Sequence, residues 1–176
     1  GKVQEEQDAQ SAPDIEAITP DFVSRCSKFT EKGDGILHSA LFRGKLVYVP
    51  ETKTWYAWNG QHWETTHIHR VEASVEEVGV KYREIAAHYD KLATEARDAG
   101  DKEEAARLGA AAERLTKRAN YLNSSRGVNA CIKFTLANAD PLITKPDIWD
   151  VDPWLLGVTN GVVDLRTGEH RPGRPS

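Results

Sequence analysis

The chain has 176 residues and a formal net charge of −4 at pH 7; 39% of its residues are hydrophobic and 28% are charged. This length suits one domain, or one domain with an insertion, and it is sufficient to bury a core. The negative net charge excludes a wholly basic nucleic-acid coat but leaves room for a local basic patch. No stretch reaches the roughly 20 apolar residues of a membrane span, so we expect no membrane partner.

Residues 1–18 are polar and acidic, and we expect a flexible linker or tail there. A domain over residues 19–176 follows, with a helical arm inserted at about residues 68–123. The chain contains no methionine, even at position 1, so we expect it to be a piece of a longer protein. Cys26 and Cys131 are far apart and lie in no pairing motif, which predicts two free thiols in a reducing cytosol.

Two helices are expected at the start of the domain. Thr19 is a good N-cap and Pro20 suits the first helical position, so the first helix should run to about Phe29. Thr30 is then expected to cap a second helix, which Gly44 ends in the left-handed conformation. The apolar residues of this second helix are expected on one side of it: Ile36, Leu37, Ala40 and Leu41.

A compact β unit is expected next. Residues 46–49 form a strand, and residues 54–58 and 61–64 flank Asn59-Gly60, which is the strongest short-range signal for a hairpin. A two-residue turn at this dipeptide places Trp58 opposite Gln61.

Three aromatic residues then share one face of the sheet, because side chains alternate along a strand and Tyr56 lies opposite Trp63. These residues are Tyr56, Trp58 and Trp63. Their face has two interpretations. It is either a platform on which nucleic-acid bases stack or the side of a small sheet that packs under a helix.

From residue 68 the apolar residues recur in alternating steps of three and four, which is the seam of a coiled coil. The first seam consists of Ile68, Val71, Val75, Val78, Tyr82, Ile85, Tyr89, Leu92 and Ala96. Ser74 with Glu77 is a capping box that offers a later start for this helix. Gly100 and Asp101 end it, and Asp101 with Glu104 resembles a new cap. The second seam consists of Ala105, Leu108, Ala112, Leu115, Ala119 and Leu122. So short a turn requires antiparallel helices, which form an arm on the order of 40 Å long.

Ser125 is expected to cap a further helix that ends before Pro141 and Pro146. Its inner side carries Val128, Cys131, Ile132, Thr135 and Leu136. A β-hairpin of residues 162–165 with residues 169–171 closes the chain. The predicted fold class is therefore α+β, with a small antiparallel sheet that contains the Trp-rich hairpin, a long antiparallel coiled-coil helical hairpin, a further helix and a C-terminal β-hairpin.

The sequence lacks the motifs of common catalytic sites. It contains no G-x-x-x-x-G-K-[ST] loop for phosphates, no G-x-S-x-G, no H-E-x-x-H and no C-x-x-C. His67 and His69 lie on one face of an extended segment, but a metal site needs further ligands, so we interpret both as exposed. We therefore expect no catalytic residue, no metal site and no cofactor in this chain.

A cluster of basic residues lies near the base of the second arm helix and in the segments after it. Its members are Arg114, Lys117, Arg118, Arg126, Lys133, Arg166, Arg171 and Arg174. One interpretation is a surface that contacts the phosphates of DNA. The other is that these residues pair with the acidic first helix of the arm, since exposed charges are common on coiled coils.

Residues 152–169 resemble the motif D-x-P-x-L-L-N-x-x-N-G-x-x-D-L-x-T-G of phage, plasmid and poxvirus-type primase-helicases. Residues 29–35 resemble the T-D-x-G-N-A segment of that family, and residues 46–63 resemble its L-R-Y-V-P … W-x-x-W-D-G-x-x-W segment. The order and spacing agree from about residue 28 to the end. The sequence departs from the pattern at Gly157, which replaces Asn, at Asp34-Gly35, which replaces Asn-Ala, and at Thr66, where Asp is common.

The resemblance implies a pre-helicase domain, which in this family lies upstream of a superfamily-three ATPase. The domain would be a collar, an oligomerisation module or a guide for DNA in phage or prophage DNA replication. The parent protein would be an ATP-dependent DNA helicase and primase in the cytoplasm of a bacterial host, with ATP and Mg²⁺ bound only by the downstream domain. The implied partners are DNA and neighbouring helicase subunits. An alternative is a protein-interaction module that uses the coiled-coil arm and has no affinity for DNA.

Overall fold

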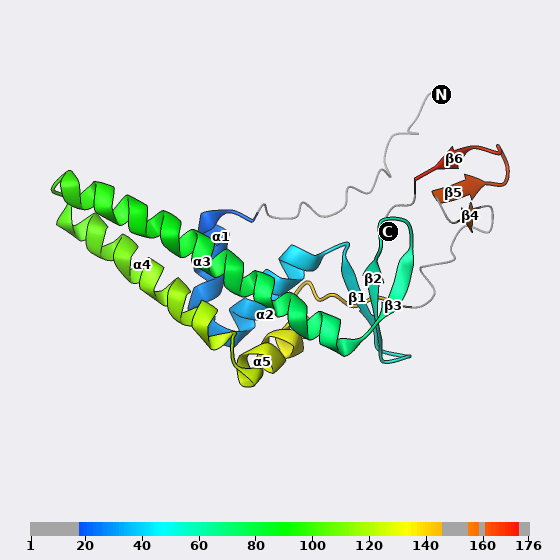
Figure 1. The fold of residues 1–176 in the computed structure, drawn as a ribbon, viewed down its shortest axis with the longest axis horizontal. Helices are drawn as coiled ribbons and strands as arrows, with labels where there is room; N and C mark the ends of the chain where they lie inside the picture. The colour runs from blue at the N-terminus through cyan, green and yellow to red at the C-terminus, as the bar shows by residue number, and fades with distance from the viewer. Residues whose placement is uncertain (1–17, 146–154, 159–160, 173–176) are drawn as a thin grey trace, which may run out of the picture.

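The structure is a computed structural model that describes residues 18–145, 155–158 and 161–172. These residues form five helices and two three-stranded antiparallel sheets (Figure 1). The expected α+β class is confirmed. The linker predicted for residues 1–18 lies outside the described residues, apart from Ile18, and so do Pro146 and Arg174.

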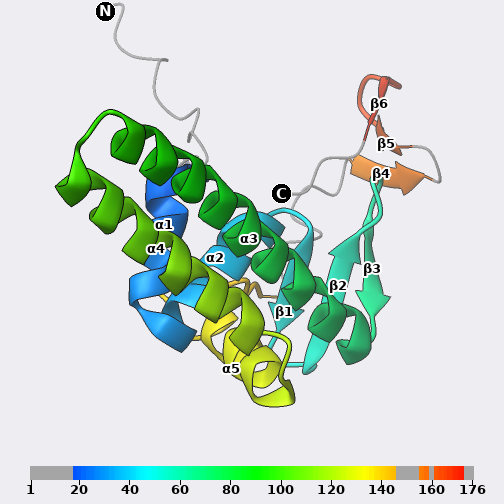
Figure 2. The same ribbon diagram turned by 60° about the vertical axis from the view of Figure 1, so that its left-hand side comes forward.

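The first helix, α1 (Pro20–Lys28), begins as expected, because the Thr19 hydroxyl accepts a hydrogen bond of 3.2 Å from the backbone N–H of Phe22. The second helix, α2 (Thr30–Phe42), differs from the prediction of a single apolar side. Its buried residues include Asp34, His38 and Ser39, whereas Ile36 is only half-buried. The reason is that α2 contacts α1, α3 and α5, so neighbouring helices surround it (Figure 2).

The first sheet contains β1 (Leu46–Val49), β2 (Thr54–Trp58) and β3 (Trp63–Thr66), in that order. The predicted two-residue turn is wrong, because Trp58 pairs with Trp63 rather than with Gln61. The side-chain oxygen of Asn59 accepts hydrogen bonds of 3.0 Å from the backbone N–H groups of Gln61 and His62. This side chain therefore closes a four-residue loop, in which Gly60 has the expected positive φ of 98°.

The arm consists of α3 (Ile68–Asp98) and α4 (Lys102–Tyr121), which run side by side and project from the rest of the helices (Figure 1). The predicted cap is confirmed, because a side-chain oxygen of Asp101 accepts a 3.0 Å hydrogen bond from the backbone N–H of Glu104. Both seams face inward as expected, except that Ile68 is 44% exposed. The later start at Ser74 is wrong, since α3 begins at Ile68.

The last helix, α5 (Ser125–Thr135), begins one residue earlier than predicted. Its N-cap is Ser124, whose hydroxyl accepts a 3.0 Å hydrogen bond from the backbone N–H of Gly127. The chain then returns to the first sheet, where the backbone N–H of Tyr48 donates to the carbonyl of Leu142 at 2.8 Å. This contact anchors the segment after α5 along β1.

The second sheet contains β4 (Leu155–Val158), β5 (Gly161–Asp164) and β6 (His170–Arg171). The pairing of β5 with β6 confirms the predicted C-terminal hairpin, and β4 adds a strand that was not predicted. Among the helices that the structure describes, none is both long and apolar enough to cross a membrane.

Gly35 allows α2 and α5 to lie in direct backbone contact. A Cβ atom at this position would lie 2.4 Å from the carbonyl carbon of Phe134 and 2.6 Å from the nitrogen of Thr135. Both are backbone atoms, so a larger residue at position 35 must push the helices apart. By contrast, Gly109 in α4 has no atom within 4 Å of its would-be Cβ.

We expect Gly35→Ala to lower the free energy of unfolding by about 2–3 kcal/mol, because overpacking displaces backbone that cannot relax. The matched control, Gly109→Ala, should raise it by about 0.5–1 kcal/mol, because alanine is the better helix former and meets no obstacle. Urea unfolding measures both values. Equal effects of the two substitutions would contradict the close approach of α2 and α5.

Candidate functional site

The basic residues predicted on α4 have partners within the protein, but not on the first arm helix. The guanidinium group of Arg114 donates to the hydroxyls of Ser27 at 3.0 Å and Ser24 at 3.3 Å, both in α1. Arg118 forms an ion pair with Asp34 of α2. The predicted pairing with α3 is therefore wrong for these two residues. Lys117 pairs with Glu113 of its own helix at 2.7 Å.

The ion pair between Arg118 and Asp34 lies inside the protein. Asp34 is fully buried, and only 14% of the Arg118 side chain is exposed. Two guanidinium nitrogens of Arg118 donate to the two carboxylate oxygens, and the hydroxyl of Tyr82 donates to one of them at 2.9 Å. The pair therefore joins α2 to both helices of the arm, α3 through Tyr82 and α4 through Arg118.

Burial and hydrogen bonding shift the pKa values of this pair in opposite directions. Burial raises the pKa of Asp34, while the hydrogen bonds from Arg118 and Tyr82 favour its ionised form. Burial alone would lower the pKa of Arg118, but its bonds to Asp34 raise the pKa above the ordinary value. Burial also raises the pKa of Tyr82, so its hydroxyl stays protonated and donates to the carboxylate.

A second contact fixes the C-terminal end of α4 to the start of α2. The hydroxyl of Tyr121 donates to a carboxylate oxygen of Glu31. The guanidinium group of Arg118 lies over the Tyr121 ring, 4.6 Å from its centroid. Such cation–π contacts favour a fixed arrangement of arginine and ring. The base of the arm is therefore held at two points along α2.

His38 occupies the other buried polar position of α2. Its Nε2 lies 2.8 Å from the hydroxyl of Ser74 in α3, and its Nδ1 lies 3.0 Å from the hydroxyl of Thr135 in α5. Its ring stacks on Phe42 with 4.7 Å between centroids. Burial lowers the pKa of His38 to about 4, so the ring is neutral near pH 7. A neutral ring donates to one hydroxyl and accepts from the other.

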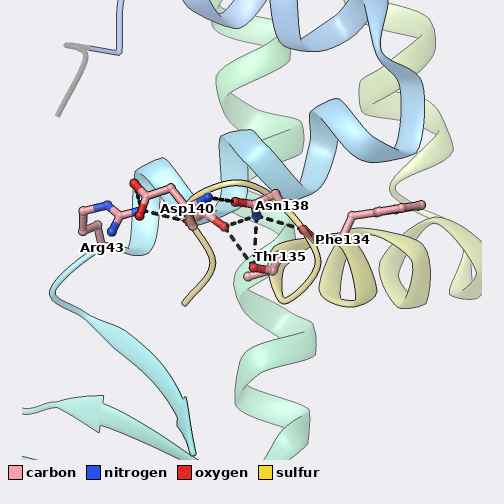
Figure 3. Close-up of polar contacts among 6 residues, drawn as sticks. Arg43, Phe134, Thr135, Asn138 and Asp140 are labelled. Atoms are coloured by element: carbon pink, nitrogen blue, oxygen red, sulfur yellow. Dashed lines mark hydrogen bonds and ion pairs between the residues drawn. The ribbon is translucent and has the colours of Figure 1, made fainter. Parts of the chain in front are cut away.

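The segment after α5 is tied to α2 by Asn138 and Asp140 (Figure 3). The side-chain amide of Asn138 donates to the Phe134 carbonyl at 2.9 Å and to the hydroxyl of Ser39 at 2.8 Å. Asp140 forms an ion pair with Arg43, directly after α2. These contacts end α5 and hold its C-terminal end against α2. They have a structural role.

The three aromatic residues predicted to share a face do so, because Trp58 pairs with Trp63 and Tyr56 is two residues before Trp58. The rings of Trp58 and Trp63 meet edge to face at 5.5 Å. The opposite face carries Trp55, which is buried against Phe42, Leu46, Val71 and Leu142. The interpretation that the three-residue face packs on the helical core is therefore wrong, since Trp55 takes that position. All three aromatic residues are half-buried.

The other predicted contact residues are exposed. Lys117, Arg126, Lys133 and Arg171 all face solvent. Arg166 forms an ion pair with Asp164 at 2.9 Å, and its hydrogen bonds hold the pKa of Asp164 at about 2.

Other groups with potential chemistry have ordinary surroundings. His67 and His69 are exposed, and His69 lies 3.0 Å from a carboxylate oxygen of Glu72. Within residues 18–145, 155–158 and 161–172, no three His, Cys, Asp or Glu side chains gather as a metal site requires. Cys26 and Cys131 are buried and form no disulfide with any cysteine of the described residues, and burial raises the pKa of Cys131.

Sequence reasoning missed Asp34 and His38 as buried polar residues. They are four positions apart on α2, which places them on one side of a helix. The available signal for their burial was the position of two polar residues at this spacing beside the apolar Leu37. The spacing alone does not tell whether that side faces water or other helices, so the burial of both residues needed the structure.

Residues 36–176 match a protein family that carries the description "D5 N terminal like". The chain belongs to this family, the N-terminal domain of phage, plasmid and poxvirus D5-type primase-helicases. The match confirms the family resemblance described above. No curated protein and no solved structure matches the chain. The match begins inside α2, so α1 and Asp34 precede it.

We expect acid to destabilise the protein through His38. In the unfolded chain this histidine takes up a proton below about pH 6.5, whereas in the folded protein it stays neutral until about pH 4. The free energy of unfolding therefore falls as the pH drops from 6.5 to 4, and this residue contributes up to about 3 kcal/mol of the loss.

Urea unfolding at a series of pH values measures this contribution by comparison with His38→Gln, which lacks the titrating ring. The control is His69→Gln, at an exposed histidine. The free energy of unfolding should depend less on pH in His38→Gln than in the wild type. Identical pH dependence in the two proteins would show that His38 is not held neutral.

Proposed function

We propose that this chain is an accessory domain of a phage or prophage DNA primase-helicase. Its role would be to help subunits assemble as a collar or to guide DNA towards the motor. The observation that carries this proposal is the family match over residues 36–176, which includes the whole arm and the first sheet. ATP hydrolysis and Mg²⁺ binding would belong to another domain of the parent protein, and we assign no catalysis to the chain itself.

The form of the arm supports an assembly role. The arm projects beyond the other helices (Figure 1). Many of the exposed residues on its outer side are charged. Ion pairs within each helix reinforce it, for example Lys81 with Glu84 at 2.7 Å and Arg107 with Glu104 at 2.5 Å. A stiff, water-covered pair of helices with a fixed base can reach a neighbouring subunit without rearranging.

The exposed cations near the base of the arm support a DNA-guiding role. Arg114 and Arg118 are half-buried against α1 and α2, whereas Lys117, Arg126 and Lys133 are exposed, so these three are the better phosphate ligands even though Lys117 also pairs with Glu113 at the surface. Lysine and arginine on helices commonly position a protein on the DNA backbone without reading its sequence. The half-buried face of Tyr56, Trp58 and Trp63 is a second candidate for DNA contact, by stacking on bases.

A second candidate function is a protein-interaction module that uses the arm and has no DNA affinity. One observation favours it: Val80, on the outer side of α3, is 49% exposed. An apolar residue on an otherwise charged helix face suits contact with another protein. This module would form oligomers and leave DNA unbound.

We expect weak DNA binding whose affinity falls linearly with salt on a log–log plot. Fluorescence anisotropy with labelled DNA measures it. The triple variant Lys117→Glu, Arg126→Glu, Lys133→Glu should reduce the slope by about 2, since each phosphate contact to a single strand contributes about 0.7. The control has the same change of charge near the tip of the arm: Lys91→Glu, Arg97→Glu, Lys102→Glu.

Binding that responds equally to both triple variants would reject the base of the arm as the contact surface. Sedimentation of the same samples separates the two functions. Oligomers without DNA affinity would favour the protein-interaction module over DNA guiding.

A further inference from the structure

The turn between α1 and α2 presents an exposed aromatic ring, and two exposed lysines lie within three residues of it in the sequence. Phe29 is 62% exposed, the highest value among the exposed large hydrophobic residues that the structure describes. Lys28 precedes it and Lys32 follows three residues later, and both are exposed. In the part of the chain that the structure describes, neither lysine takes part in an ion pair. An exposed aromatic ring with exposed cations near it in the sequence suits an anionic partner with flat rings.

The backbone holds this turn in an unfavourable conformation. Thr30 has a φ of 52°, in the left-handed region that β-branched residues rarely adopt. A Cβ atom on Gly33 would lie 1.8 Å from the carbonyl oxygen of Cys26, so the start of α2 packs directly on the end of α1. The backbone N–H of Phe29 also donates to that oxygen, at 3.0 Å. Strain of this kind persists where the surroundings fix it, and it is concentrated at functional positions.

The neighbouring helices make the surface around the turn more basic. Arg114 binds Ser24 and Ser27, and Tyr121 binds Glu31, so the base of α4 lies along the end of α1 and the start of α2 (Figure 2). Lys117 and Arg126 add exposed cations on α4 and α5.

The nearby acidic groups of these helices have partners. Asp34 is paired with Arg118, and Glu113 is paired with Lys117. Glu31 accepts the Tyr121 hydroxyl. The Tyr121 hydroxyl leaves the charge of Glu31 in place, but the lysines and arginines of these segments outnumber Glu31, Asp34 and Glu113, so the local charge is positive although the net charge of the chain is −4.

We propose that this turn is a contact site for single-stranded DNA, in which the Phe29 ring stacks on a base and Lys28 and Lys32 bind the adjacent phosphates. Sites for single strands combine cations that follow the backbone with aromatic rings on which bases stack. A duplex does not offer its bases for such stacking, so the site prefers single strands. The proposal rests on the DNA-guiding role above and gives it a location. Residues 28–32 precede the family match, so the match does not account for them.

The test is the fluorescence anisotropy of a labelled oligothymidylate with the whole chain. We expect Phe29→Ala to weaken binding about tenfold, since stacking on one base contributes about 1–3 kcal/mol. Phe29→Trp should retain the affinity, because it keeps a ring in the same place. The double variant Lys28→Gln, Lys32→Gln should reduce the salt slope by about 1.4, at 0.7 for each phosphate.

The control is Leu165→Ala, at another exposed apolar residue, which should leave binding unchanged. Thermal unfolding of each variant establishes that the fold is intact. If the wild type binds and Phe29→Ala binds equally well, this site is wrong while DNA guiding through other residues stands. If the wild type does not bind single strands, the site and the DNA-guiding role both fail, and the assembly role is unaffected.

Discussion

A carboxylate inside a helical core must be neutralised, and this constraint organises the protein around Asp34. Arg118 supplies the counter-charge and Tyr82 supplies a further hydrogen bond. The two residues come from different helices of the arm. The ion pair and the hydrogen bonds to this one carboxylate therefore hold both α3 and α4 against α2. An unpaired buried charge costs several kcal/mol, which makes any other placement of the arm base unfavourable. The buried ion pair thus acts with the contacts of Arg114 and Tyr121 to set the direction in which the arm projects.

The same helix carries the other buried polar contacts. His38 links α2 to Ser74 of α3 and Thr135 of α5, and Ser39 accepts from Asn138 beyond α5. Each contact is specific in direction, unlike apolar burial, so together they specify how α5 packs. The close approach at Gly35 brings the two backbones into contact. α2 is therefore the structural centre of the described helices, and the turn proposed to contact single-stranded DNA lies directly before it.

The features that depend on local spacing were predictable from the sequence. Both seams of the arm, the cap at Asp101 and the C-terminal hairpin follow from periodicity and turn residues, and the structure confirms them. The features that depend on tertiary neighbours were not predictable. Which helices meet determines three such features: the partners of Arg118, the burial of His38 and the position of Trp55 in the core. The predicted register of the Trp-rich hairpin is wrong for a different reason. The Asn59 side chain closes a four-residue loop, whereas the Asn59-Gly60 dipeptide indicates a two-residue turn.

The central claim is that the Asp34–Arg118 pair holds the base of the arm, and a double-mutant cycle tests it most directly. The free energy of unfolding would be measured for the wild type, Asp34→Ala, Arg118→Ala and the double variant, with the exposed Glu113–Lys117 pair of α4 as the control cycle. We predict a coupling energy of about 2 kcal/mol or more for the buried pair and below about 0.5 kcal/mol for the exposed pair. A coupling for Asp34 and Arg118 no larger than that of the exposed pair would contradict the account.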